Sequence, residues 1–431
     1  MPNRRTPILL VTLPLACAVL VAAAVLTDRD AGADTASAST ESASAMAPFA
    51  EAVTAAERAV RNAPFAGSAT ELAEGLDYVR GLTKNAVRMA WNDDPDFPRM
   101  EQLTAADGKV GLDNPDAIYM RAPLRDDAEY VVTGTRSTVK DLSFQILSGD
   151  YLALPFPQSL AAFGDNSFTI APDGSYSFRL SPHCSGARDC VALPQGSGVL
   201  FTREVYSDWD TERRGSITIR RSDRIGAAPE PTTPDREAAR FRAAADFLTG
   251  QVSLWIDFTS QMYGPLPPNT LTQPKSTAGG LPTQYSSTGT YSLADDEALI
   301  VTVPRSAAPY QGIQLGSDWY VSLDYINHST SLTADQARTD PDGQLRFVVS
   351  RQDPGLANWL ETTGHDTGYI HLRWQGQTEP LTDVDKPTVE VVKVSELPRK
   401  LPFYAQAGIS PEQYRQAIAA RQIAVADRMI S

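Results

Sequence analysis

Apolar positions recur at helical spacing near the start of the chain and again in its middle. We expect one helix over about 48–60 and a second that opens at Ser68, where Glu71 three residues later completes a capping-box pattern. A long third helix is expected to begin after Thr233 at Pro234. A last helix follows Ser410, with proline at its first position.

From residue 113 onward the period of the apolar pattern changes from helical spacing to alternation. Short runs of this kind predict strands over 118–121, 130–133, 168–170, 176–178, 199–205, 216–220, 288–292, 298–303, 319–325, 345–350, 369–374 and 389–394. We expect the first two runs to form a hairpin, and the third and fourth to form another around Asp173-Gly174. Short strands separated by turn signals favour a sandwich or jelly roll over a parallel sheet.

These elements define the predicted fold class, which is mainly β with helical additions (α+β). We expect two β-sandwich or jelly-roll-like units, N-terminal helices, a long linking helix and a C-terminal helix. The predicted boundaries are 1–33 for an export segment, 34–47 for an Ala/Ser/Thr spacer, 48–110 for the helical N-terminal region, 111–226 for the first β unit, 227–265 for the linker and long helix, 266–400 for the second β unit, and 401–431 for the C-terminal helix.

The N-terminus carries an export pattern. Arg4 and Arg5 precede an apolar run over 7–26, which is closer to the roughly 20 residues of a membrane helix than to the about 7–15 of a secretory core. This length favours an uncleaved anchor, while the small residues over 31–33 offer a cleavage site for a signal peptide. Both routes place the bulk of the chain outside the cytoplasm, either membrane-anchored or secreted.

Charge and cysteine content narrow the possible partners. Acidic side chains outnumber basic ones by 52 to 38, and the net charge of -14 argues against nucleic-acid binding. Of the three cysteines, Cys17 lies in the export segment, and we expect Cys184 and Cys190 to form a disulfide in an oxidising compartment. A metal site formed by the two cysteines and His183 would lack a fourth ligand. We therefore expect neither a metal nor a cofactor.

Residues 288–376 carry a set of motifs that resembles a known family. The motifs are WYVSLDY over 319–325 with His328, RQDPG over 351–355, NWLETTGH over 358–365 and LRW over 372–374. They resemble the bacterial family called domain of unknown function twelve-fourteen, whose longer members are also similar at 73–78 and 113–119. The resemblance implies a jelly-roll-like β structure with helical additions, and it implies no reaction.

The same motifs hold the candidate functional residues, since no nucleophile elbow, zinc-protease motif, phosphate loop or dinucleotide fingerprint is present. As acid–base catalytic candidates we consider Asp324, His328 and His365. As ligand-binding candidates we consider Tyr325, Arg351, Trp359, Arg373 and Trp374. The structural alternative is turn chemistry for Asp353, core packing for the tryptophans and a loop position for His365.

Three functions fit these observations. The first is an envelope-associated extracytoplasmic protein that binds a carbohydrate or lipid-like surface component and touches the membrane through its N-terminal segment. An alternative is an extracytoplasmic hydrolase of an ester or glycosidic bond. A further alternative is a structural component of an envelope assembly. The sequence specifies neither the ligand nor the oligomeric state.

Overall fold

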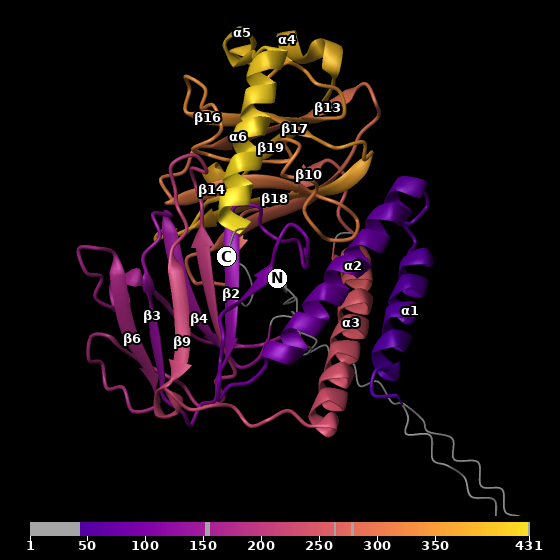
Figure 1. Ribbon diagram of the computed structural model, residues 1–431. Helices are drawn as coiled ribbons and strands as arrows, with labels where there is room; N and C mark the ends of the chain where they lie inside the picture. Colours follow the sequence, from indigo (N-terminus) through magenta and orange to yellow (C-terminus); the bar gives the residue numbers. More distant parts are fainter. Residues whose placement is uncertain (1–43, 151–155, 263, 277–279, 430–431) are drawn as a thin grey trace, which may run out of the picture. The chain divides into compact units, whose positions relative to one another are not determined.

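The computed structural model describes residues 44–150, 156–262, 264–276 and 280–429 (Figure 1). The predicted export segment and most of the predicted spacer lie outside these ranges. Within them the chain forms nineteen strands in four sheets, together with six α-helices. None of the described helices is both long and apolar enough to cross a bilayer. The predicted fold class, mainly β with helical additions, is confirmed.

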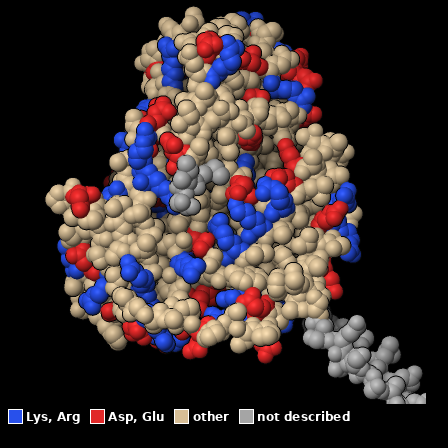
Figure 2. All heavy atoms as spheres, viewed as in Figure 1, with Lys and Arg blue, Asp and Glu red and all other residues tan. Residues whose placement is uncertain are grey.

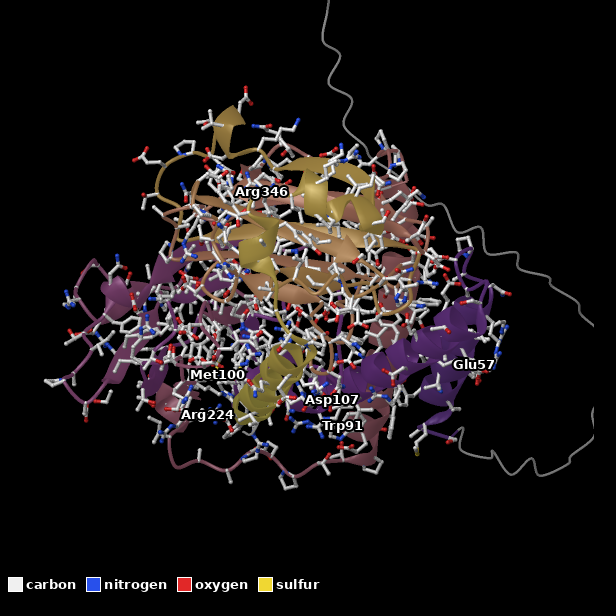
Figure 3. The ribbon with its side chains drawn as sticks, turned by 90° about the horizontal axis from the view of Figure 1, so that it is seen from above. Glu57, Trp91, Met100, Asp107, Arg224 and Arg346 are labelled. Carbon is white, nitrogen blue, oxygen red and sulfur yellow. A yellow bond between two sulfur atoms is a disulfide. The ribbon has the colours of Figure 1, made fainter. Side chains whose placement is uncertain are left out.

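Three helices pack together beside the sheets. They are α1 (Ala47–Arg61), α2 (Ala69–Asn92) and α3 (Pro234–Met262), and both α1 and α2 lie against α3. The predicted capping box opens α2, because Ser68 Oγ accepts a hydrogen bond from the Glu71 N–H while the Glu71 carboxylate accepts one from the Ser68 N–H. Seen from above, Trp91 at the end of α2 lies beside α3, where its ring meets Phe241 at 4.9 Å (Figure 3).

The first β unit consists of two sheets that face each other. One has the order β1–β2–β8–β4–β5 and the other β7–β6–β3–β9. The strands are β1 (Glu101–Thr104), β2 (Ala117–Pro123), β3 (Tyr130–Thr135), β4 (Asp141–Leu147), β5 (Ser159–Gly164), β6 (Ser175–Ser181), β7 (Cys190–Ala192), β8 (Val199–Val205) and β9 (Ser216–Arg221). Buried aromatic residues such as Phe144, Phe168 and Phe178 fill the space between the sheets, as alternation in a sandwich requires.

The second β unit repeats this construction. Its sheets have the orders β10–β12–β18–β14–β15, with β11 also paired to β12, and β17–β16–β13–β19. The strands are β10 (Thr270–Leu271), β11 (Lys275–Ser276), β12 (Tyr285–Ser292), β13 (Glu297–Pro304), β14 (Tyr310–Gly316), β15 (Ser331–Thr333), β16 (Gln344–Ser350), β17 (Trp359–Glu361), β18 (Thr367–Gln375) and β19 (Thr388–Lys393). Val301, Phe347 and Trp374 are among the residues of its core.

The C-terminal helices connect the two β units. After α4 (Leu397–Lys400) and α5 (Tyr404–Ala407), the helix α6 (Pro411–Met429) runs from the second unit back to the first (Figure 1). Arg421 is buried and donates to the carbonyls of Tyr325 and Ser331, each at 2.7 Å. The guanidinium of Arg428 lies 4.0 Å from the centre of the Trp209 ring. The last helix therefore contributes cations, as well as apolar surface, to the junction.

The predicted strand over 319–325 and the predicted first hairpin are wrong, and residues 168–170 form no strand. Residues 319–325 form a loop, in which Tyr320 takes a left-handed conformation with φ of +55° and Asp324 caps the backbone of Ile326 and Asn327. The predicted hairpin of 118–121 with 130–133 does not form either, because β2 pairs with β1 and β8 while β3 pairs with β6 and β9. The aromatic and β-branched residues over 319–325 suit a strand locally, but tertiary packing decides otherwise. Both runs of the predicted hairpin do form strands, which pair with other partners.

The turn at Asp173-Gly174 is present, with Gly174 at a φ of +82°, but a single bridge between Ile170 and Tyr176 replaces the longer predicted pairing. The predicted disulfide between Cys184 and Cys190 is confirmed, with 5.5 Å between the two Cα atoms. It closes the loop between β6 and β7, which lie parallel to each other.

A short polar segment before β2 joins the two β units. The Asp113 carboxylate accepts hydrogen bonds from the N–H and hydroxyl of Ser322, at 2.9 and 2.8 Å. The Asp116 carboxylate accepts one from the Tyr310 hydroxyl at 2.8 Å and one from the Trp209 indole at 3.0 Å. Since both aspartates are buried, these bonds satisfy charges that water does not reach. We call Asp113, Asp116, Trp209, Tyr310 and Ser322 the carboxylate joint.

We predict that Tyr310→Phe destabilises the protein by about 1–3 kcal/mol, because it leaves the buried Asp116 carboxylate without one of its donors. Tyr291→Phe is the matched control. Both tyrosines lie in strands of the second unit and are 1% exposed, but the Tyr291 hydroxyl has no hydrogen-bond partner in the described structure. Chemical denaturation of both variants measures the difference, and equal effects would contradict the structural role of the joint.

Candidate functional site

The strand β18 has two faces with different roles. Ile370, Leu372 and Trp374 point into the core of the second unit, whereas Tyr369, His371 and Arg373 alternate with them and face the first unit. Of the two ligand-binding candidates here, Trp374 is therefore a core residue that is 1% exposed. Arg373 lies at the junction between the units.

The first unit presents a matching row from β2 and β8. Ile118 and Leu200 belong to its core, and the alternate residues Tyr119, Phe201 and Arg203 lie on the opposite face of the sheet. The rings of Tyr119 and Phe201 stack with centres 5.7 Å apart. The Arg203 guanidinium lies over Phe201 at 4.4 Å, a cation–π contact.

These two faces and α3 border a chamber that is partly open to solvent. It has a volume of about 250 Å³, and its wall includes Tyr119, Phe201, Arg203, Trp255, Tyr320, His371 and Arg373. We call it the His371 chamber. The Trp255 ring, from α3, stacks on Tyr320 with ring centres 5.2 Å apart. Aromatic rings thus line the chamber, and Asp113, Arg203, His371 and Arg373 also border it.

His371 is the least satisfied polar residue of the chamber. It is 9% exposed, and neither ring nitrogen has a hydrogen-bond partner among the described residues. Burial lowers the pKa of the imidazole well below its ordinary value, and the nearby Arg373 guanidinium lowers it further. The ring is therefore neutral at pH 7, with one donor and one acceptor unused. Native proteins rarely leave buried polar groups in this state.

Arg373 is a buried cation whose contacts are neutral. It is 6% exposed and donates to the carbonyl of Leu112 at 2.8 Å and to the side-chain oxygen of Gln314. Within the described ranges no carboxylate forms an ion pair with it. Asp113 also borders the chamber, but its two oxygens already accept hydrogen bonds from Ser322. A buried charge with neutral partners is costly to the fold.

The backbone around the chamber is strained. Gly111, Leu112 and Tyr320 all border it, and all three have positive φ angles, of +63°, +46° and +55°. Glycine is required at 111, because a Cβ atom there would lie 2.8 Å from the Trp255 ring. For leucine and tyrosine the left-handed region is unfavourable, and such outliers cluster at ligand sites.

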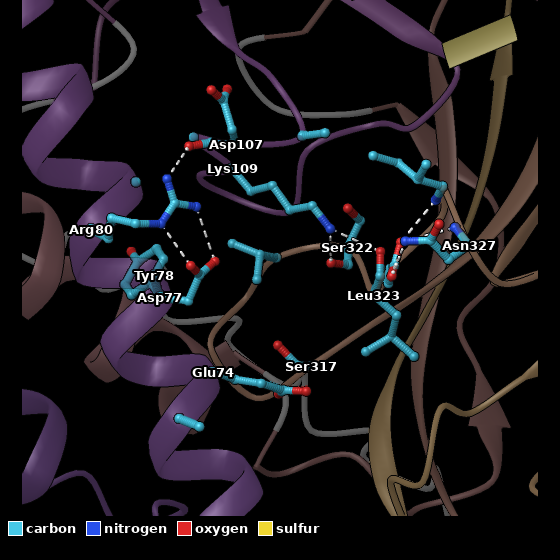
Figure 4. A pocket seen from close by; sticks show the side chains of 17 residues that line it. Glu74, Asp77, Tyr78, Arg80, Asp107, Lys109, Ser317, Ser322, Leu323 and Asn327 are labelled. Atoms are coloured by element: carbon cyan, nitrogen blue, oxygen red, sulfur yellow. Dashed lines mark hydrogen bonds and ion pairs between the residues drawn. The ribbon is translucent and has the colours of Figure 1, made fainter. Parts of the chain in front are cut away.

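A second cavity, of about 460 Å³, lies between α2 and the loop over 317–327 (Figure 4). We call it the α2 cavity. Lys109 reaches across it and donates to the carbonyls of Ser322 and Leu323, at 2.7 and 2.9 Å. Burial lowers the pKa of Lys109, while the nearby Asp113 and Asp324 carboxylates oppose this shift. Its ammonium also lies 4.8 Å from the centre of the Tyr325 ring.

Charged groups that border the α2 cavity are already paired with each other or with neighbours. Asp77 pairs with Arg80 at 2.7 Å, Asp107 pairs with Lys84, and Glu74 pairs with His365 at 2.9 Å. The candidate Asp324 borders the cavity too, and it accepts a hydrogen bond from the Asn327 amide at 2.8 Å (Figure 4). The charged groups of this cavity are satisfied by one another or by neighbours, whereas His371 in the other chamber has no hydrogen-bond partner among the described residues.

The three acid–base candidates occupy separate environments. Asp324 caps its own loop, His365 bonds Glu74, and the His328 imidazole lies 2.9 Å from the Glu361 carboxylate. No hydrogen bond or ion pair of the described structure joins any two of them. Their relative placement therefore assembles no acid–base pair.

The remaining ligand-binding candidates serve as local anchors. Trp359 is buried, and its indole donates to the Ser350 carbonyl at 3.1 Å. Arg351 forms ion pairs with Asp295 and Asp366, each at 2.6 Å. The buried Tyr325 ring lies 6.4 Å from that of Trp209. Asp353 accepts a hydrogen bond from the Gly355 N–H at 2.7 Å, as a turn residue does.

The sequence analysis missed most of the chamber. Neither Trp255 nor His371 is among the candidate residues named from the sequence. Alternation along 369–374 was the available signal, since it places His371 and Arg373 on one face of a strand. Nothing in the sequence indicated that Tyr119, Phe201 and Tyr320 would come to face them.

Charges on the outer surface follow a more ordinary pattern. Figure 2 shows lysines and arginines intermixed with acidic side chains over the visible face. Exposed ion pairs of the described residues include Lys393 with Asp296 at 2.8 Å and Lys400 with Glu390 at 2.5 Å. Exposed pairs of this kind contribute little to stability. Arg373 differs from them because it is buried and pairs with no carboxylate of the described residues.

Comparison with known proteins identifies one informative relative. No family model and no curated protein matches the chain. An uncharacterized protein from Burkholderia cenocepacia, known from its crystal structure, has a TM-score of 0.74 and 30% identity, over 82% of this chain and 98% of that chain. A structure from Vibrio parahaemolyticus has a TM-score of 0.42 and 12% identity, over 79% of this chain and 100% of that one, which is too low a likeness to interpret.

The fold and the chamber thus define a two-unit β protein with a helical flank. The chain belongs to the same family as the Burkholderia cenocepacia protein, which it matches over nearly all of that protein's length.

We predict that Glu74→Gln lowers the melting temperature at pH 6 and has little effect at pH 9. Burial disfavours the imidazolium of His365, but the hydrogen bond and charge of Glu74 outweigh this, and the pKa of His365 is raised. The pair therefore stabilises the fold below the unfolded pKa of about 6.5 and loses this contribution as the pH rises through the folded pKa.

The effect should stay below about 1 kcal/mol, because more than a third of the Glu74 side chain is exposed to solvent. Glu57→Gln is the control, since Glu57 pairs with Arg61 and contacts no titrating histidine. Thermal melts at both pH values compare the two variants. A pH-independent loss in Glu74→Gln would refute the ion pair.

We predict that His371→Phe leaves stability at pH 7 unchanged or raises it by up to about 1 kcal/mol, because the imidazole gives up no hydrogen bond. The pKa of His371 is lowered in the folded protein, so below a pH of about 6.5 only the unfolded state takes up the proton. The stability of the wild-type protein therefore falls as the pH drops below this value. The variant should lack this part of the acid sensitivity.

Gln314→Met is the matched control for this variant. Gln314 lies opposite His371 in the β14–β18 ladder and is 2% exposed, but it donates to the Asp113 carbonyl at 2.8 Å. Urea denaturation at pH 7 should show a loss of about 1–3 kcal/mol for Gln314→Met. A loss of the same size in His371→Phe would mean that His371 is a structural residue.

Proposed function

We propose that this protein is an extracytoplasmic binding protein that holds a small lipid-like ligand in the His371 chamber. The observation that carries the proposal is the unpartnered His371 imidazole, which is buried at the wall of an aromatic cavity. Binding sites are mostly apolar and contain a few convergent polar groups. The chamber has this composition, and its imidazole has no partner among the described residues, whereas the charged groups of the α2 cavity are paired.

The size of the chamber limits the ligand. Its volume of about 250 Å³ equals that of roughly eight liquid water molecules. A ligand with one aromatic ring or a short aliphatic chain fits this space, whereas a membrane lipid with two acyl chains does not. The stacked ring pairs Trp255–Tyr320 and Tyr119–Phe201 favour an apolar ligand over a polyhydroxylated one.

The extracytoplasmic location and the family placement are parts of the same proposal. The apolar run after Arg4 and Arg5 supports export. The disulfide between Cys184 and Cys190 supports an oxidising compartment. On the motifs over 319–325 and 358–365, we propose that the family shared with the Burkholderia cenocepacia protein is the one resembled by residues 288–376.

The hydrolase alternative has weaker support. Acid–base hydrolysis requires a carboxylate and a second titrating group within reach of one substrate atom. Asp324, His328 and His365 are instead held by different partners, in a loop, by Glu361 and by Glu74. Binding requires no such assembly, and the chamber alone suffices for it.

Direct binding measurements on the full-length chain test the proposal. Isothermal titration with a panel of one-ring aromatic and medium-chain aliphatic molecules should give at least one ligand that Trp255→Ala weakens tenfold or more, because the variant removes a wall of the chamber. Trp91→Ala is the control, since Trp91 packs against the same apolar cluster but does not border the chamber.

Two results would overturn the proposal. One is the absence of binding across the panel. The other is an equal loss in Trp91→Ala and Trp255→Ala, which would indicate a general loss of stability. A monosaccharide that binds while the apolar molecules do not would point to carbohydrate recognition instead.

A further inference from the structure

We propose that the ligand of the His371 chamber is a small organic acid, whose carboxylate is held by Arg373 and His371. This inference rests on the proposed binding function and assigns the class of its ligand. Its starting point is the charge inside the chamber, where a buried guanidinium meets only neutral oxygen atoms.

The donors of Arg373 suit a carboxylate. A guanidinium has five N–H groups in a planar fork that matches the two oxygens of a carboxylate. One group bonds the Leu112 carbonyl and another the Gln314 side chain. These contacts fix the orientation of the guanidinium and leave its charge uncompensated. An anion in the chamber would supply the missing charge in a place that water reaches poorly.

His371 supplies a neutral hydrogen bond beside this cation. The two residues are two positions apart on β18, so their side chains leave the strand on the same face. A neutral imidazole donates to a carboxylate without adding a second positive charge next to Arg373. A ligand carboxylate therefore satisfies His371 and Arg373 together, whereas a neutral ligand satisfies at most the imidazole.

The rest of the chamber suits the body of such an acid. Trp255 and Tyr320 stack on one side, and Tyr119 and Phe201 stack on the other. The Asp113 carboxylate, which would repel an anion, is engaged by two hydrogen bonds from Ser322. The preferred ligand then has one carboxylate and one aromatic ring or short aliphatic chain.

Matched pairs of ligands test this assignment on the full-length protein. Phenylacetate is compared with 2-phenylethanol and phenylacetamide, and octanoate with octanol, by isothermal titration at pH 7 in constant salt. We expect the acid of a pair to bind at least tenfold more tightly than its neutral analogues. The wild-type comparison alone decides the question, so it does not depend on the folding of any variant.

Variants at Arg373 and His371 test which side chains recognise the carboxylate. Arg373→Gln should remove most of the preference for the acid, about tenfold or more, while affinity for the neutral analogue stays within threefold of wild type. His371→Gln keeps a neutral donor and should retain more of the preference than His371→Phe. Arg351→Gln is the control, because Arg351 pairs with Asp295 and Asp366 and does not border the chamber.

The outcomes separate this inference from the function on which it rests. Equal binding of acid and alcohol, sensitive to Trp255→Ala, would overturn the acid assignment and leave the binding function in place. An acid preference that survives Arg373→Gln would also overturn it. Binding of neither class would overturn both.

Discussion

The carboxylate joint is the interaction on which the arrangement of the two β units depends. Asp113 and Asp116 belong to the segment that leads into β2, yet their hydrogen-bond donors Ser322 and Tyr310 belong to the second unit. Buried carboxylates are stable only when their partners stay in place, so a shift of one unit against the other would leave charges unsatisfied. The cations of α6, Arg421 and Arg428, add favourable charge close to Asp116. Apolar packing alone would tolerate sliding more easily than this network does.

The chamber is a consequence of that fixed arrangement. Because the joint holds β18 opposite β2 and β8, two strand faces that would otherwise meet water enclose a space between them. The same segment also supplies Gly111 and Leu112, whose left-handed backbone brings the wall close to Trp255. Local strain at these residues is sustained by the many contacts around them. The joint and the chamber are therefore adjacent in the chain, with Asp113 in the joint and Leu112 at the chamber.

Local patterns in the sequence predict most of the helices and strands, but they do not predict how these elements pack together. The capping residues Ser68 and Glu71, the proline at 234 and the alternation along 369–374 each act within a few residues, and the structure has α2, α3 and β18 where these signals indicate. Tyr320 and Val321 have strand-like side chains, yet their conformation is set by Asp113 and Leu112, some two hundred positions away. The chamber also depends on contacts between residues distant in sequence, because Tyr119, Trp255 and His371 come from three separate regions of the chain.

The unsatisfied groups of the chamber matter because folding alone gives no reason for them. Phenylalanine at 371 would pack as well as histidine and would need no hydrogen bond, and an apolar residue at 373 would need no counter-charge. A fold that satisfies Asp113, Asp116 and Arg421 nearby clearly has the means to satisfy buried polar groups. The exceptions at His371 and Arg373 lie side by side at one cavity wall, where strained backbone and stacked aromatic rings also converge. Stability is given up at these two residues while the surroundings remain well satisfied, and this contrast supports the proposed ligand site.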